Sequence, residues 1–183
     1  METMSLEHVI LVDKFDRKTG IMEKQEVHQK GLLHRAFSVF IFNSEGKVML
    51  QKRASDKYHS GGLWTNTCCG HPKPGEKTLQ AAKRRLYEEM GLHCKLTKVF
   101  SFTYFSVLGN NLIEYELDHV FIGTCDEQPS LHPQEAEDWK LADVKSIQTD
   151  IVENHNSYSS WFKIAYPQVI QIFDYREAVL TNF

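Results

Sequence analysis

The chain has 183 residues, 42% of them hydrophobic and 25% charged, with eleven Phe, seven Tyr and three Trp to fill a core. These values exclude an intrinsically disordered chain and predict a single domain over residues 1–183. The net charge of −3 excludes a global positive field for nucleic acid or anionic lipid, and every apolar run is far shorter than the roughly 20 residues of a membrane-spanning helix.

The first residues and the cysteines predict the compartment. Residues 1–7 carry acidic side chains where a signal peptide needs basic ones. The four cysteines form no recognisable disulfide framework, and two of them, Cys68 and Cys69, are adjacent. We therefore expect a cytoplasmic protein whose thiols are reduced and available for chemistry.

Strands dominate the first third of the chain. Four are predicted, at residues 9–12, 21–26, 34–42 and 48–53. The segment 34–42 is a nearly continuous apolar run, and the turn residues 43–46 that follow predict a hairpin with the next strand.

A helix is predicted over residues 78–90, with Thr78 as its N-cap and Gly91 as its C-terminal stop. Its apolar face should consist of Leu79, Ala82, Leu86 and Met90. Two strands and two helices follow, at residues 96–107, 112–125, 141–147 and 161–175, the last of them interrupted or kinked at Pro167. Strands that flank an internal helix predict an α+β fold, in which helices pack on a mixed sheet.

The predicted central helix ends in an unfavourable charge pattern. Glu88 and Glu89 lie in its last turn, where the helix dipole disfavours anions by roughly 0.3–1 kcal/mol each. Arg84 and Arg85 stand four residues before them and can offset this cost through ion pairs. Taken alone, the pattern indicates a solvated charged face.

The spacing around this helix resembles the Nudix box. That pattern is Gly, five residues, Glu, seven residues, then Arg-Glu-hydrophobic-any-Glu-Glu-any-Gly-hydrophobic, and it is matched here by Gly70, Glu76, Arg84, Leu86, Glu88, Glu89, Gly91 and Leu92. Nudix hydrolases use the helix carboxylates to hold a divalent metal against a diphosphate. Arg85 stands where the box has Glu, which argues against ordinary diphosphate hydrolysis.

Flanking motifs resemble one branch of that superfamily, the type 1 isopentenyl-diphosphate Δ-isomerases. They are Trp64–Pro72 (WTNTCCGHP), Gly31–Ser38 (GLLHRAFS), the Glu114-x-Glu116 pair and Ser160–Phe162. The resemblance spans nearly the whole chain. It implies a Nudix-type α/β/α sandwich, an isomerase of isoprenoid biosynthesis, a small allylic or homoallylic diphosphate as substrate, and a monomer or weak homodimer. Residues 1–33 would form a partial lid.

Three histidines and a row of acidic residues are candidate metal ligands. Glu114 and Glu116 are two residues apart on a predicted strand, so both point to one face, and Asp118 continues the row. The resemblance implies a metal site made of His28, His34, His71, Glu114 and Glu116. This mixed set suits Mn²⁺, Mg²⁺ or Zn²⁺, and ligand type does not decide among them. The other histidines are interpreted as a packed strand residue (His119) or as surface residues (His8, His59, His93, His132 and His155).

The resemblance also implies a diphosphate-binding site. A Mg²⁺ ion that bridges the substrate diphosphate would be held by Glu89 and by the backbone carbonyl of Cys69, in keeping with the preference of Mg²⁺ for oxygen. The basic residues that would bind the diphosphate are Lys24, Arg53, Lys57 and Arg85. The neighbouring Lys52, Lys83 and Arg84 are interpreted as surface charges.

The implied reaction is a 1,3-proton shift through a tertiary carbocation. Cys69 and Glu116 match the acid–base pair of the family, Tyr104 a proton relay, and Trp161 the aromatic that faces the cation. Which of the pair protonates is open. Without the resemblance, Cys69 is a small buried apolar residue and both aromatics are core residues. Two alternatives remain: a metal-dependent Nudix diphosphate hydrolase, and a non-catalytic diphosphate-binding module.

Overall fold

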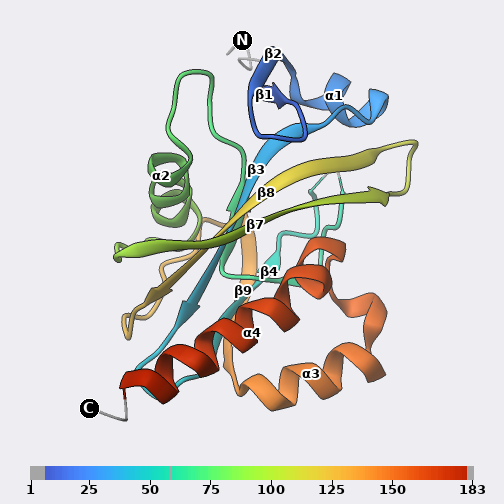
Figure 1. The fold of residues 1–183 in the computed structure, drawn as a ribbon. Helices are drawn as coiled ribbons and strands as arrows, with labels where there is room; N and C mark the ends of the chain where they lie inside the picture. The colour runs from blue at the N-terminus through green and yellow to red at the C-terminus, as the bar shows by residue number, and fades with distance from the viewer. Residues whose placement is uncertain (1–6, 58, 181–183) are drawn as a thin grey trace.

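The computed structural model describes residues 7–57 and 59–180, with side chains up to Asp174 (Figure 1). The strands are β1 (His8–Val12), β2 (Lys18–Glu23), β3 (His34–Phe42), β4 (Val48–Arg53), β5 (Trp64–Thr65), β6 (Cys68–Gly70), β7 (Leu96–Val107), β8 (Ile113–Thr124) and β9 (Ala136–Ala142). The helices are α1 (Lys24–Lys30), α2 (Thr78–Met90), α3 (Val144–Glu153), the 3₁₀ turn η1 (His155–Ser157) and α4 (Ser160–Leu180). Within this described part, no helix is long and apolar enough to cross a membrane.

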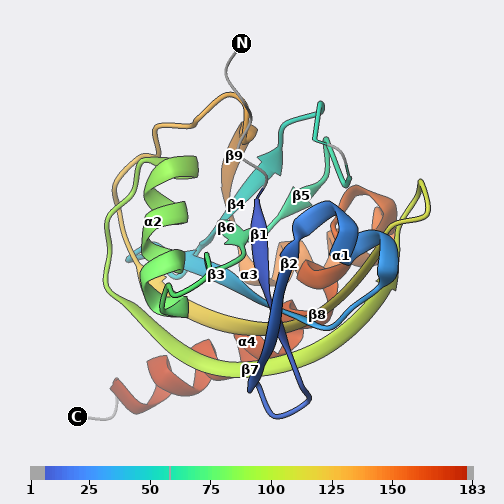
Figure 2. The same cartoon turned by 90° about the horizontal axis from the view of Figure 1, so that it is seen from above.

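β3 is the central strand of a mixed sheet. It runs parallel to β8 and antiparallel to β1, β4 and β6, while β7 extends the sheet beyond β8. Helix α2 covers one face, and α3 and α4 lie on the other, with the β1–β2 hairpin and α1 above one end (Figures 1 and 2). The predicted α+β architecture with a mixed sheet is therefore confirmed.

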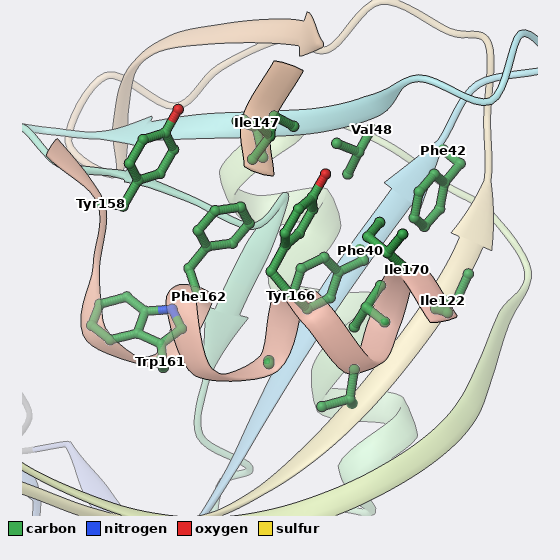
Figure 3. Packing of buried hydrophobic residues seen from close by; sticks show 14 of the residues in the cluster. Phe40, Phe42, Val48, Ile122, Ile147, Tyr158, Trp161, Phe162, Tyr166 and Ile170 are labelled. Atoms are coloured by element: carbon green, nitrogen blue, oxygen red, sulfur yellow. The ribbon is translucent and has the colours of Figure 1, made fainter. Parts of the chain in front are cut away.

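Both faces of β3 are buried, which explains its continuous apolar run. Phe37, Val39 and Ile41 pack against α2, while Phe40 and Phe42 pack in a second core under α4. Figure 3 shows this second core, where aromatic rings of α4 lie against the strand. The alternation follows from the two-residue period of a strand.

The bounds of two predicted elements are wrong, one because a local helix cap ends a strand early and one because strand pairing replaces the start of a helix. The strand predicted at 21–26 ends at Glu23, whose carboxylate accepts hydrogen bonds from the N–H groups of Gln25 (2.8 Å) and Glu26 (2.7 Å) and so starts helix α1. The helix predicted at 141–147 begins only at Val144, since Leu141 pairs with β4 as part of strand β9.

Details of two helices also differ from prediction. Lys77, and not Thr78, occupies the N-cap of α2, whereas Gly91 ends the helix with a φ of 68° as predicted. Leu79 is 39% exposed, and its predicted place in the buried face is taken by Ala81. Helix α4 continues through Pro167, so the interruption predicted there is absent.

Replacing Gly123 with alanine will destabilise the fold by about 1–3 kcal/mol. Gly123 lies in β8 between β3 and β7, and a Cβ there would come within 2.9 Å of the Ile41 and Leu96 side chains and of the Lys95 carbonyl oxygen. Urea unfolding checks this. A Gly109→Ala control, where a Cβ meets nothing within 4 Å, should change the free energy of unfolding by less than about 0.5 kcal/mol. Equal unfolding midpoints for the two variants would contradict the close packing.

Candidate active site

Strand register brings the candidate metal ligands together. His34 at the start of β3 is the direct partner of Glu116 on β8, helix α1 supplies His28, and His71 follows β6. One ligand atom from each of these four residues lies within 4.8 Å of the others. All four are almost fully buried, so a shared cation would be shielded from water.

Hydrogen bonds fix the imidazole rings for metal binding. The Nδ1–H groups of His28 and His34 donate to the carbonyls of Lys24 (2.7 Å) and Leu32 (2.8 Å), because a carbonyl can only accept. With Nδ1–H used in this way, Nε2 of each ring is the atom that can offer a lone pair to a cation at the centre of the group. His34 Nε2 lies 3.2 Å from His71 Nε2, which lies 3.0 Å from Glu116 Oε1. A divalent cation would satisfy all of these acceptors at once.

Glu114, the fifth predicted ligand, lies beside this group. Among the described residues it is not part of the four-residue cluster. Its carboxylate lies 3.4 Å from the Tyr104 hydroxyl and 3.5 Å from His59 Nδ1. Burial and the neighbouring Glu116 carboxylate raise the pKa of Glu114 well above its ordinary value. A nearby cation would favour the ionised form of Glu114 and lower its pKa again, so the position fits a site that binds positive charge.

Cys69 lines a cavity of about 410 Å³ that also receives Glu116, Tyr104 and Trp161. Burial raises the pKa of the Cys69 thiol to about 12, against the lowering effect of Arg53, whose Nη1 lies 3.7 Å from Sγ. Cys68, the preceding residue, is fully buried in the core beneath α2. The two adjacent thiols therefore lie in different surroundings, Cys68 in the core and Cys69 at the cavity.

The two aromatic residues are held by specific hydrogen bonds. The Tyr104 hydroxyl donates to Glu116 Oε2 at 2.7 Å, because the two residues are direct partners across β7 and β8. The Trp161 indole N–H donates to Asn66 Oδ1 at 3.0 Å, and the Arg53 guanidinium lies 5.3 Å from the centre of its ring. The ring is thus fixed, and it already faces one cation.

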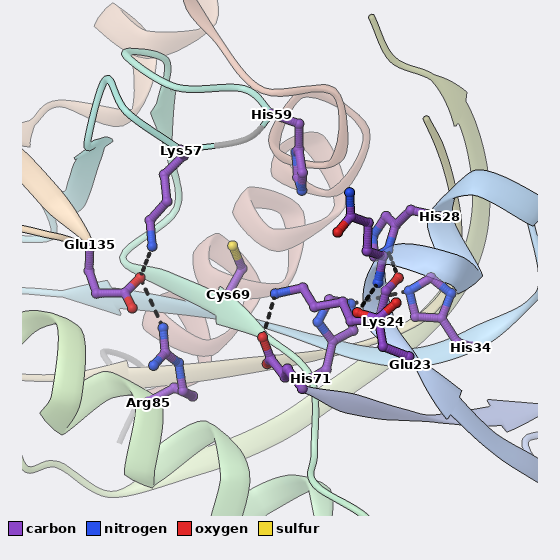
Figure 4. Close-up of polar contacts among 12 residues, drawn as sticks. Glu23, Lys24, His28, His34, Lys57, His59, Cys69, His71, Arg85 and Glu135 are labelled. Carbon is purple, nitrogen blue, oxygen red and sulfur yellow. Dashed lines mark hydrogen bonds and ion pairs between the residues drawn. The ribbon is translucent and has the colours of Figure 1, made fainter. Parts of the chain in front are cut away.

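All four predicted diphosphate ligands line the same cavity; they are Lys24, Arg53, Lys57 and Arg85. Figure 4 shows Lys24 extending from α1 away from His28 and His34, while Lys57 and Arg85 meet at Glu135. Lys24 pairs with Glu7 at 3.0 Å. Burial works to raise the pKa of Glu7, yet the Lys24 charge prevails and lowers it to about 2.

Glu89 is a buried carboxylate that accepts a hydrogen bond at each oxygen. Gln51 Nε2 donates to Oε2 at 2.9 Å, and Arg85 Nη2 donates to Oε1 at 2.8 Å. Each oxygen keeps a second acceptor position, so the carboxylate can also bind Mg²⁺. The predicted Arg84–Glu88 and Arg85–Glu89 pairs are both present, and Arg84 also contacts Glu76 at 2.8 Å.

Several residues of the cavity region were not predicted from the sequence. His59, predicted on the surface, has only 10% of its side chain exposed and lies between the histidine group and Trp161, so that prediction is wrong. Burial lowers the pKa of His59 to about 3. Glu7 and Glu135 line the cavity, and Gln51 holds Glu89. These residues reach the cavity through the packing of loops and strands, and no spacing pattern in the sequence predicts their position.

A mixed sheet between helices, with a carboxylate-bearing helix beside the cavity, is the arrangement expected of a Nudix-type protein. The model of the NUDIX domain matches residues 32–162. Among solved structures, a Deinococcus radiodurans protein aligns with a TM-score of 0.72 at 16% identity, covering 86% of this chain and 96% of its own. The MutT protein of Methanosarcina mazei gives 0.64 at 15% identity, with 76% and 94% coverage.

Closer relatives identify the branch. An isopentenyl-diphosphate Delta-isomerase of Pectobacterium atrosepticum is 51% identical over 91% of this chain and 93% of its own length. One from Photorhabdus laumondii is 52% identical, with 86% and 89% coverage. The chain belongs to the isopentenyl-diphosphate Delta-isomerase family of Nudix proteins.

Proposed function

We propose that this protein interconverts isopentenyl diphosphate and dimethylallyl diphosphate in isoprenoid biosynthesis. The observation that carries the proposal is the shared cavity, in which the Cys69 thiol and the Glu116 carboxylate stand with Trp161 and a set of cations. A diphosphate needs the cations, and an alkene needs a proton donor and a proton acceptor. Family membership at about half identity supports the same activity.

In the proposed reaction, a proton is added to the terminal alkene carbon and a second is lost from C2. The intermediate is a tertiary carbocation at C3, and charge balances because one proton enters as another leaves. Cys69 and Glu116 give and receive these protons, and their roles exchange in the reverse direction. The Tyr104 hydroxyl, at 2.7 Å from Glu116, relays or holds a proton at that carboxylate.

Trp161 would stabilise the carbocation. A cation over an indole face gains about 2 kcal/mol or more when it is desolvated. The ring is nearly fully buried and held by Asn66, so it presents one face without rearrangement. Arg85, in the position of a Nudix-box glutamate, replaces a hydrolytic carboxylate with a diphosphate ligand.

The metal proposal follows from the buried donor set. His28, His34, His71 and Glu116, with Glu114 as a fifth ligand, would hold Mn²⁺, Mg²⁺ or Zn²⁺. A bound ion supplies positive charge that keeps Glu116 ionised and oriented. Glu89 and the Cys69 backbone carbonyl would hold a second ion, Mg²⁺, on the substrate diphosphate.

Some expectations extend beyond the site. The chain would form a single catalytic domain with residues 1–33 as a partial lid, although residues 1–6 and 181–183 lie outside the described part. The described segment 7–33 supplies both Lys24 and His28. We also expect a monomer or a weak homodimer. It would work in a reducing cytoplasm and would bind neither nucleic acid nor a membrane. Free cysteines support the compartment.

Incubation with isopentenyl diphosphate and Mg²⁺ in deuterated water tests the function. The product should be dimethylallyl diphosphate that carries deuterium, because the added proton comes from exchangeable groups of the site. Proton and phosphorus NMR follow the reaction. Release of phosphate or diphosphate without isomerisation would instead support the hydrolase, and binding without reaction would support the non-catalytic module.

A further inference from the structure

Glu135 joins two cations from separate parts of the fold. Its Oε2 atom contacts Lys57 Nζ and lies 3.0 Å from Arg85 Nη2 (Figure 4). Lys57 belongs to the turn after β4, and Arg85 to helix α2. Two like charges that approach the same point repel each other unless an anion lies between them. The Glu135 carboxylate is that anion.

The main chain holds Glu135 in this place independently of its side chain. The Ala54 N–H donates to the Glu135 carbonyl at 3.0 Å, and the Lys57 N–H donates to the Ala54 carbonyl at 3.2 Å. The Glu135 N–H in turn donates to the His132 carbonyl at 2.9 Å. The two loops are therefore already docked, and the carboxylate acts on the side chains that extend from them.

The charge state of Glu135 suits this role. Burial works to raise its pKa, but the hydrogen bond from Lys57 and the charge of Arg85 prevail and lower it. Arg85 also contacts Glu88 and Glu89, each at 2.8 Å, so its guanidinium is held from several sides. The Glu135 carboxylate contacts both Arg85 and Lys57 at the wall of the cavity and so links the two cations.

We propose that Glu135 is a positioning residue that holds Lys57 and Arg85 as a convergent pair for the substrate diphosphate. The inference rests on the proposed function, in which these two cations bind the diphosphate. Glu135 itself carries the same charge as the diphosphate and acts only through the cations. Its removal should therefore weaken diphosphate binding and leave the proton-transfer groups untouched.

The test compares Glu135→Gln with Glu137→Gln. Glu137, also on the β9 side of the fold, pairs with Lys52 at 2.8 Å and so provides a matched control. Glu135→Gln should raise KM for isopentenyl diphosphate about tenfold and change kcat less than about threefold. The reason is that Lys57 and Arg85 would bind the diphosphate equally well in the ground state and in the transition state. Calorimetry with inorganic pyrophosphate and Mg²⁺ should show the same loss of affinity, and Glu137→Gln should match wild type in both.

A double-mutant cycle separates positioning from a general structural effect. Once Lys57→Met has removed one cation, adding Glu135→Gln should weaken pyrophosphate binding by less than about twofold further. Three outcomes would overturn the proposal. Glu135→Gln could bind pyrophosphate as tightly as the wild type or more tightly, or the losses in the cycle could be additive. The third outcome is that the wild-type protein does not bind pyrophosphate. If the wild type binds pyrophosphate and Glu135→Gln weakens it, but no isomerisation occurs, the proposed function fails and the role of Glu135 stands.

Discussion

Replacing Cys69 with alanine will lower turnover by roughly 10³-fold or more. The thiol lines the same cavity as Glu116, and a methyl group can neither donate nor accept a proton. An alkene is a very weak base, so water cannot replace a placed proton donor at a useful rate. The initial rate of dimethylallyl diphosphate formation at saturating substrate measures the effect.

Cys68→Ala is the matched control for this substitution. Cys68 precedes Cys69 in strand β6, but its side chain packs in the core beneath α2. Its loss should cost about 1 kcal/mol or more of stability and leave turnover within a fewfold of wild type. Thermal melting and pyrophosphate binding verify that both variants are folded. A Cys69→Ala enzyme with a rate near that of wild type would refute the proposed acid–base pair.

Removal of divalent metal will abolish most of the activity, with a loss of roughly 10²-fold or more. Three imidazoles and the Glu116 carboxylate converge within 4.8 Å, which is a donor set that one divalent cation would join. The melting temperature should fall as well, because an ion bound only to the folded state stabilises it. Mass spectrometry of the metal content, together with rates before and after exhaustive chelation, measures both effects.

Two histidine variants distinguish the loss of a metal ligand from the general effect of replacing a buried histidine. His71→Ala removes a proposed ligand and should lower both metal content and rate. His119→Gln alters another buried histidine of the region, which pairs with Asp16 at 3.0 Å and lies outside the ligand group, so metal content should stay at the wild-type level. Re-addition of Mn²⁺, Mg²⁺ or Zn²⁺ to the chelated protein identifies the ion that restores activity. A full rate in metal-free protein would eliminate the proposed centre.

Local signals in the sequence predict those elements whose pattern agrees with the tertiary structure. The bounds of β3 and α2 match the predicted ranges, because a run buried on both faces and a helix that ends at glycine depend on nearby residues. Prediction fails at Leu141, where pairing with β4 outweighs helical preference. It also fails at Glu23, which caps a helix that interrupts the expected strand.

The candidate site shows the same division. The resemblance to the isomerase family pointed to Cys69, His71 and Glu116, and all three line one cavity of the structure. His59 and Glu135 escaped prediction, because one lies in a turn and the other in a loop with no periodic pattern. Their contacts to Trp161 and Lys57 join segments far apart in the chain.

The amino-acid sequence by itself determined the α+β class, the strongest strands and the central helix, and its motifs indicated a diphosphate isomerase. The class and the elements depend on residue types and on spacing between near neighbours, whereas the activity was indicated through the resemblance of the motifs to a known family. Only the tertiary structure decided that His34 faces Glu116 across two parallel strands and that Glu135 bridges Lys57 and Arg85. Strand register and loop docking set those contacts, and both arise from the packing of the whole chain.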